Sequence, residues 1–358
     1  MTDSLLDARI VRMPAFAPGP WLNTPPLARE QLRGQVLLID FWDYTCINCL
    51  RTLPYMRAWH ARYADKGLTI IGIHAPEFKF AHDRQQLEMA AAEFGLDYPI
   101  LLDNAYENWH RFATRAWPTK VLVDADGYIR YRRQGEGYYA ETERAIQELL
   151  RLRDPAATLP ALMPPLRPED RSGAVCYPST PELHTGFATG LFGGLLGNPE
   201  GYVLETPMLY RLPPREAWQP GSFYVDGFWQ AHPEYIAFAG QDNGYLELPF
   251  AAVGVNAVLS PTGDEVALRL GLMPAQERRV LLKQDRRWLH PGIAGQDVQI
   301  DEYGISFVNV TRPRLYELVR NPDFGEHQLQ LIFQATGLAV YSFTFTTCVR
   351  EGRGARGE

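Results

Sequence analysis

The stretch Leu37-Leu-Ile-Asp-Phe-Trp-Asp-Tyr-Thr-Cys46-Ile-Asn-Cys49 decides the fold of this chain. The residues from Gln35 to Trp42 form a short apolar run that ends abruptly, which is typical of a buried strand. From Ile47 onward, apolar residues recur every three or four positions and predict a helix to about residue 65. Cys46 therefore lies at a helix N-terminus, where unpaired N–H groups and the helix dipole favour a negative charge. We expect this position to lower the pKa of Cys46 towards roughly 7 or below.

Two cysteines separated by two residues either form a redox-active disulfide or supply half of a structural zinc site. Structural zinc normally takes four ligands, usually from two such pairs. The chain has four cysteines, and its sequence contains no second Cys-X-X-Cys and no His-X3-5-His. Disulfide exchange through Cys46 and Cys49 is therefore the favoured interpretation, with no metal and no cofactor other than this disulfide.

The segment Asp40-Phe41-Trp42 followed by Cys46 and Cys49 resembles the active-site strand and helix of thioredoxin. The resemblance implies that Cys46 is the attacking thiol and that Cys49 resolves the mixed disulfide. It also implies that Asp40 is the buried carboxylate that exchanges a proton with Cys49. The alternative for Asp40 is a polar residue at a strand end, although ionisable residues within apolar runs tend to be functional.

Trp117-Pro118-Thr119 opens the predicted strand at residues 120–124. In thioredoxin-like proteins a cis-proline at this place faces the cysteine pair, so the resemblance implies a cis bond before Pro118. It further implies a substrate site that includes Trp42, Trp117 and Thr119, in which the Trp117 backbone pairs with an extended substrate strand. The alternative is an edge proline that only begins a strand.

His74 and Glu77 follow a second predicted strand, residues 68–74, near the strand ends where the cysteines lie. A carboxylate at the Glu77 position occurs in thioredoxin-like proteins that act on extracytoplasmic thiols. The resemblance therefore implies a catalytic role for Glu77 in tuning the pKa of the cysteines. The alternatives are a solvated loop acid at Glu77 and a simple strand-end residue at His74, for which proton transfer is disfavoured.

The first domain is predicted to span residues 14–153 with a thioredoxin-like α/β fold of element order βαβαβαββα. Within it, the stretches Trp42–Tyr55 and Ile73–Phe78 resemble the thioredoxin-like part of TlpA- and DipZ-type proteins. In DipZ-type proteins that part is fused to a membrane domain that carries electrons. This sequence shows no such membrane part, so its electron donor is unidentified.

Residues 154–171 contain five prolines and predict an extended linker. From residue 172 to 349, short alternating segments such as 265–270, 326–334 and 340–346 predict an all-β sandwich. This part resembles the C-terminal jelly roll of DipZ-type proteins, which is similar to carbohydrate-binding modules. Four aromatic residues are candidates for stacking on a sugar, although aromatic residues in sandwiches more often belong to the core: Trp218, Phe223, Trp229 and Tyr235.

The composition excludes several classes of function. The net charge of -7, without a basic block, argues against nucleic acid. No apolar run approaches the ~18 residues of a membrane helix, and the N-terminus lacks a secretory signal. We therefore expect a cytoplasmic protein, or an extracytoplasmic one if a signal has been trimmed. In the cytoplasm Cys176 and Cys348 are expected to be two unrelated buried thiols, although their positions also permit a disulfide.

These observations predict a thiol–disulfide oxidoreductase that exchanges electrons with protein or small-thiol partners through Cys46 and Cys49. The direction of exchange is left open. An alternative of another class is a glycan- or protein-binding adaptor, in which the sandwich does the work and the redox domain is accessory. A thiol peroxidase needs Pro-X3-Thr-X2-Cys, but Ile39 and Asp43 stand at the matching places, so this alternative is disfavoured.

Overall fold

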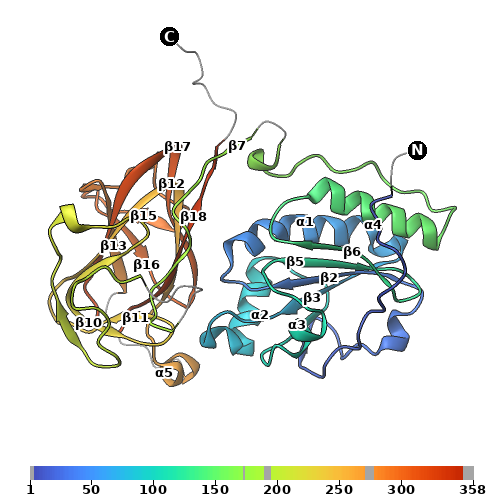
Figure 1. Ribbon diagram of the computed structural model, residues 1–358, viewed down its shortest axis with the longest axis horizontal. Helices are drawn as coiled ribbons and strands as arrows, with labels where there is room; N and C mark the ends of the chain where they lie inside the picture. The colour runs from blue at the N-terminus through green and yellow to red at the C-terminus, as the bar shows by residue number, and fades with distance from the viewer. Residues whose placement is uncertain (1–3, 172–173, 189–194, 271–277, 350–358) are drawn as a thin grey trace, which may run out of the picture. The chain divides into compact units, whose positions relative to one another are not determined.

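The computed structural model describes residues 4–171, 174–188, 195–270 and 278–349. The chain forms two compact units, Met1–Arg171 and Ser172–Glu358 (Figure 1). The first has the predicted α/β class and the second the predicted all-β class. Across these described ranges, every helix is too short or too polar to cross a bilayer.

The first unit is a six-stranded sheet with helices on both faces (Figure 1). Its strand order is β1-β4-β3-β2-β5-β6. The three strands β2, β3 and β4 are parallel, whereas β1, β5 and β6 run antiparallel to their neighbours. In chain order the elements are β1 (Trp21–Leu22), β2 (Val36–Trp42), α1 (Ile47–Tyr63), β3 (Leu68–His74), α2 (Arg84–Glu93), β4 (Ile100–Leu102), α3 (Glu107–Arg111), β5 (Thr119–Val123), β6 (Ile129–Gln134) and α4 (Tyr139–Arg153).

Strand β2 is buried along its whole length, as its apolar sequence requires. Side chains of a strand alternate between its two faces. Leu37, Ile39 and Phe41 join one core cluster with Trp109 of α3. Asp40 therefore points to the opposite face, which α1 and α4 cover (Figure 1). The alternation thus places a carboxyl group beneath the helix that begins with the cysteine pair.

The segment predicted as a linker, residues 154–171, is instead fixed to the first unit. The Met163 N–H donates to Glu143 on α4 at 2.9 Å, and the Leu166 N–H donates to the Tyr55 hydroxyl on α1 at 2.8 Å. Its prolines prevent regular structure apart from one short 3-10 turn, Pro168–Asp170. An extended chain thus runs along two helices, held by side chains that accept its N–H groups.

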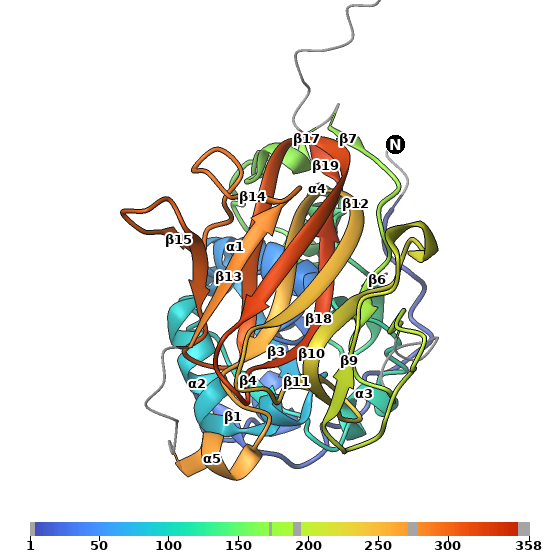
Figure 2. The ribbon, with the colours of Figure 1, turned by 90° about the vertical axis from the view of Figure 1, so that its left-hand side faces the viewer.

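The second unit is built on one 11-stranded sheet. Its two longest strands, β12 and β17, run side by side (Figure 2). Strand β12 pairs with β10 near its start and with β18 near its end, so the sheet changes neighbours along it and encloses an apolar core. The elements are β7 (Val175–Cys176), β8 (Leu183–His184), β9 (Met208–Tyr210), β10 (Tyr224–Ala231), β11 (Ile236–Phe238), β12 (Gly244–Ser260), α5 (Glu265–Leu270), β13 (Arg279–Gln284), β14 (Arg287–Trp288), β15 (Val298–Ile300), β16 (Ser306–Asn309), β17 (Arg314–Phe333), β18 (Ala339–Thr346) and β19 (Cys348–Val349).

Two predictions for this unit are wrong. Residues Glu265–Leu270 form the short helix α5 and not a strand, because the Asp264 carboxylate caps the N–H groups of Val266 and Ala267. Cys176 and Cys348 are not separate buried thiols but a disulfide. They are cross-strand partners in the antiparallel pair β7–β19, and Cys176 is exposed.

Two of the four aromatic residues considered for sugar stacking are core residues. Phe223 and Trp229 are fully buried in the core of the second unit. The ring of Trp218 stacks on Tyr224 at 4.7 Å, and Tyr235 packs against Tyr341 at 4.9 Å. The core interpretation therefore holds for Phe223 and Trp229, whereas Trp218 and Tyr235 are partly exposed rings that each pack against a neighbouring tyrosine.

Candidate functional site

The two cysteines meet at the start of α1, as the sequence predicts. Cys46 caps the helix: its sulfur accepts a hydrogen bond from the Cys49 N–H at 3.2 Å. Both cysteines are free thiols in this structure. Cys46 is partly exposed, whereas Cys49, one turn further along the helix, is 1% exposed. This difference in access suits Cys46 to attack a substrate and Cys49 to act behind it.

The prediction that the helix N-terminus lowers the pKa of Cys46 is wrong for this site. Burial raises the pKa of the Cys46 thiol, and the negative charges of Glu77 and Asp43 raise it further. The hydrogen bonds from Cys49 act in the opposite direction but are outweighed. Burial also raises the pKa of Cys49 well above its usual range, assisted by its hydrogen bond with Cys46. Both shifts favour the protonated form of the thiol.

Asp40 lies in the position implied by the thioredoxin resemblance. The side chain is 1% exposed, and neither carboxylate oxygen has a hydrogen-bond partner among the described residues. Burial raises the pKa of Asp40 to about 7, although the charge of Lys120 opposes the rise. Asp40 in turn raises the pKa of Cys49, so the two groups interact. A carboxyl group with a pKa near 7 can both accept and return a proton at neutral pH.

Lys120 is a functional candidate that our sequence analysis missed. It is the cross-strand partner of Asp40 on β5 and is fully buried, with its Nζ donating to the Gly135 carbonyl at 3.1 Å. Burial lowers the pKa of Lys120, whereas the charges of Asp40 and Cys49 raise it. Lysine is almost never fully buried without a partner. Its place inside the apolar run Lys120-Val-Leu-Val was a signal of this role.

A second buried acid, Asp43, lies just beyond the end of β2. Its Oδ1 is 3.0 Å from Nε2 of His74 at the end of β3, and both side chains are 0% exposed. Its Oδ2 accepts hydrogen bonds from the Thr45 hydroxyl at 2.6 Å and from the Glu77 N–H at 3.0 Å. The Asp43 carbonyl accepts the Cys46 N–H at 3.3 Å. Asp43 therefore connects the turn that carries Cys46 with the loop that carries Glu77.

The Trp117–Pro118 peptide bond is cis, as the resemblance implied. The Pro118 carbonyl accepts the N–H of Gly135 at 2.7 Å, in the loop that also receives the Lys120 ammonium. The Trp117 indole donates to the Ala75 carbonyl at 3.0 Å, which holds the ring beside the end of β3. This places the proline loop and the loop after β3 in direct contact.

Two of the predicted substrate-binding residues are packing residues in this structure. Trp42 is fully buried, and its ring meets His74 edge-on at 5.6 Å. Thr119 is also fully buried, and its hydroxyl turns back to the Ala116 carbonyl at 2.6 Å. Both residues lie on central strands, where the neighbouring strands and helices cover them. Trp117 is the member of the predicted set that remains partly exposed.

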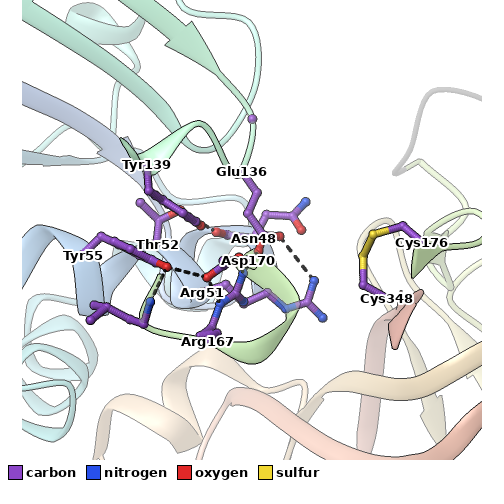
Figure 3. Close-up of polar contacts among 12 residues, drawn as sticks. Asn48, Arg51, Thr52, Tyr55, Glu136, Tyr139, Arg167, Asp170, Cys176 and Cys348 are labelled. Carbon is purple, nitrogen blue, oxygen red and sulfur yellow. Dashed lines mark hydrogen bonds and ion pairs between the residues drawn. A yellow bond between two sulfur atoms is a disulfide. The ribbon is translucent and has the colours of Figure 1, made fainter. Parts of the chain in front are cut away.

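A polar network borders the first turns of α1 (Figure 3). Glu136 pairs with Arg51 at 3.3 Å and with Arg167 at 2.5 Å. Arg167 also binds Asp170, whose carboxylate accepts the Tyr55 hydroxyl at 2.7 Å. Burial and the bond to Asp170 raise the pKa of Tyr55 to about 12, so it stays a donor. The network fastens the segment 154–171 beside the helix of the cysteines.

Two sequence families match the chain. Residues 22–132 match the AhpC/TSA family, and residues 180–346 match a family described as thioredoxin like C-terminal domain. The first match lies within the α/β unit and the second within the all-β unit. The predicted resemblance of the first domain to thioredoxin-like proteins is confirmed, whereas the likeness of the second domain to carbohydrate-binding modules stays a prediction.

Several named proteins are similar to parts of the chain. Protein DipZ of Mycobacterium tuberculosis is 35% identical over 254 residues, which cover 70% of this chain and 35% of DipZ. Thiol-disulfide oxidoreductase ResA of Bacillus cereus is 25% identical over 120 residues, 34% of this chain and 66% of ResA. The chain thus spans about a third of the length of DipZ.

Among solved structures, a "putative Thiol:disulfide interchange protein DsbE" from Chlorobium tepidum is similar to 40% of this chain. The match covers 98% of that protein, with 20% identity and a TM-score of 0.36. A "Putative Thioredoxin" from Neisseria meningitidis covers 41% of this chain with 23% identity and a TM-score of 0.36.

Proposed function

We propose that this chain is a thiol–disulfide oxidoreductase that reduces disulfides of protein partners through Cys46 and Cys49. The observation that carries the proposal is the arrangement of the two thiols: a partly exposed Cys46 sulfur hydrogen-bonded to the N–H of a buried Cys49, with an unpaired carboxyl group, Asp40, beneath them. No further cofactor enters this proposal.

In the first step, the Cys46 thiol passes its proton to solvent water, and the resulting thiolate attacks one sulfur of a substrate disulfide. A mixed disulfide forms, and the other substrate sulfur leaves as a thiolate. In the second step, Asp40 accepts the Cys49 proton, and the Cys49 thiolate attacks the Cys46 sulfur. The Cys46–Cys49 disulfide forms, the second substrate thiolate leaves, and two electrons have passed to the substrate. An external dithiol donor then restores the two thiols.

The reducing direction is supported by the charges around the thiols. A couple becomes a strong oxidant when its reduced form is stabilised, as happens when a thiolate is favoured. Here burial and the acids Glu77 and Asp43 raise the pKa of Cys46 and disfavour its thiolate. The proposed consequence is a low reduction potential, so that the dithiol gives up its electrons readily.

Substitution of each cysteine tests the mechanism. Cys46→Ser is expected to abolish reduction of insulin disulfides, because the attacking sulfur is lost. Cys49→Ser is expected to accumulate a mixed disulfide between Cys46 and the substrate, visible as an adduct in non-reducing mass spectrometry. Cys176→Ser/Cys348→Ser is the control and is expected to retain insulin reduction. Insulin reduction that survives both active-site substitutions would falsify the proposal.

We also propose that the chain works in an oxidising compartment and not in the cytoplasm. The support is the exposed disulfide between Cys176 and Cys348, since glutathione and thioredoxin keep such thiols reduced in the cytosol. Acid quenching of cells followed by thiol alkylation and mass spectrometry measures the state of this pair. An intact disulfide is expected, and alkylation of both thiols would contradict the proposal.

A further inference from the structure

The loops after β2 and β3 carry two acids whose charges act on Cys46, and one buried pair joins these loops. Trp42 and His74 are the last register partners of these parallel strands, so the residues that follow them lie side by side. The Asp43 carboxylate uses both oxygens: Oδ1 meets His74 Nε2 at 3.0 Å, and Oδ2 accepts the Glu77 N–H at 3.0 Å. Active-site loops on rigid strand ends are positioned by such bonds.

The side chains around the pair are aromatic. The Tyr44 ring stacks on His74 at 5.5 Å with an interplanar angle of 9°, and Trp42 meets its edge. Nδ1 of His74 has no hydrogen-bond partner among the described residues. Burial opposes ionisation of Asp43, but its bonds with His74, Thr45 and the Glu77 N–H lower its pKa below the usual range. Asp43 is therefore an anion inside the protein.

The charge of Asp43 reaches the attacking thiol. Asp43 also accepts the Cys46 N–H through its carbonyl at 3.3 Å, so the two residues belong to one turn. The charges of Asp43 and Glu77 both act on Cys46 and favour its protonated form. One residue thus fixes where Glu77 lies and adds a second negative charge beside the same sulfur.

We propose that Asp43 and His74 are a positioning pair for the redox couple. Their buried hydrogen bond holds the turn of Cys46 against the loop of Glu77, and the Asp43 charge favours the protonated Cys46 thiol. His74 acts by holding the Asp43 carboxylate in place. This inference rests on the proposed thiol–disulfide exchange at Cys46.

Asp43→Asn in the full chain tests the inference, because it keeps the shape and one acceptor while removing the charge. The rate of Cys46 alkylation by iodoacetamide, followed by peptide mass spectrometry against pH, reports the pKa of Cys46. A fall of about one unit is expected, with alkylation about tenfold faster at a fixed pH below that pKa. The midpoint potential of the Cys46–Cys49 couple is expected to move in the positive direction.

Asp124→Asn is the matched control. Asp124 is 4% exposed, pairs with Arg9 and Arg130, and follows β5 at the end of the sheet away from Cys46. It is expected to leave both the pKa of Cys46 and the potential unchanged. An unchanged pKa of Cys46 in Asp43→Asn would overturn the inference.

His74→Gln distinguishes the effect of the Asp43 charge from that of loop packing. It also provides a test if Asp43→Asn does not fold. Glutamine keeps an N–H donor for the Asp43 carboxylate, so the negative charge stays beside Cys46. The pKa of Cys46 is expected to stay or rise. A fall as large as that in Asp43→Asn would show that loop disruption is the cause and would overturn the inference. Alkylation of Cys46 needs no disulfide, so a failure of the proposed exchange is recognised separately, as a Cys46–Cys49 pair that never oxidises.

Discussion

Asp40 and Asp43 are three positions apart in the sequence and both are buried, yet their surroundings shift their pKa values in opposite directions. Asp40 lies inside β2 beneath α1, and its oxygens have no hydrogen-bond partner among the described residues. Asp43 lies in the loop beyond the strand, where an imidazole, a hydroxyl and a backbone N–H meet its carboxylate. Burial raises the pKa of Asp40 to about 7, whereas these bonds lower that of Asp43.

The difference shows that burial alone does not decide the charge of an acid. A strand interior offers few spare donors, because its N–H groups are engaged in the sheet. A loop at the strand ends has free N–H groups and neighbouring side chains that can turn inward. The first region therefore suits a group that must take and release a proton, and the second suits a permanent anion.

The largest expected effect is a gain in stability for Asp40→Asn at alkaline pH. The pKa of Asp40 is about 7 in the folded state against about 3.9 in the unfolded state. Ionisation is therefore opposed by folding: the penalty is absent below about pH 4, grows up to about pH 7 and is complete above it. Three units correspond to about 4 kcal/mol, which asparagine removes. Urea unfolding at pH 4 and pH 8 measures the change.

The same variant is expected to slow release of the mixed disulfide about 100-fold, since the proton acceptor for Cys49 is lost. Asp97→Asn is the stability control, because Asp97 is a largely exposed acid of the same unit. It is expected to change the free energy of unfolding by less than about 0.5 kcal/mol at either pH. Equal stability of Asp40→Asn and the unaltered protein at pH 8 would contradict the high pKa.

The second largest expected effect is a loss of stability. Asp43→Asn is expected to lower the free energy of unfolding at pH 7 by about 3 kcal/mol, because it breaks a fully buried pair. The pKa of Asp43 is lowered by folding, so its contribution is complete above the unfolded pKa and disappears as the pH falls through the folded one. Urea unfolding from pH 7 to pH 3 checks this. A gain in stability like that of Asp40→Asn would abolish the contrast.

The smallest expected effect is a change in the pKa of Asp40 when Lys120, its cross-strand partner, loses its charge. Lys120→Met keeps the volume of the side chain but removes the ammonium that opposes the rise in the pKa of Asp40. We expect that pKa to rise by about one further unit, followed by carbon-13 NMR titration of the carboxyl group. Lys66→Met, at a surface pair with Asp65, is expected to leave it unchanged. An unaltered titration in Lys120→Met would show that the two groups do not interact.

The sequence predicts what is local in this site. The strand, the helix and the place of Cys46 at their junction follow from apolar periodicity over fewer than thirty residues. The cis bond before Pro118, which the structure contains, and the proposed role of Asp40 came from a resemblance carried by short motifs. Two partners of the Asp43 carboxylate, His74 and Glu77, lie 31 and 34 positions away, and periodicity does not reveal such contacts.

Three of the failed predictions show tertiary surroundings outweighing a local rule. The helix N-terminus was expected to lower the pKa of Cys46, but burial and two neighbouring acids raise it. The alternation at Glu265–Leu270 indicated a strand, but the Asp264 cap produces a helix. Cys176 and Cys348 were predicted to be unpaired thiols because a reducing compartment was assumed. The pairing of β7 with β19 instead brings them together as a disulfide.

The disulfide between Cys176 and Cys348 has a topological consequence. Cys176 and Cys348 are 172 positions apart, so the bond between them converts nearly the whole second unit into a covalently closed ring. A single protease cut within the ring releases no fragment until the disulfide is reduced. The first and last strands of this unit, β7 and β19, are adjacent. A circular permutant that joins these two ends and opens the chain at a surface loop within the ring would therefore preserve the sheet.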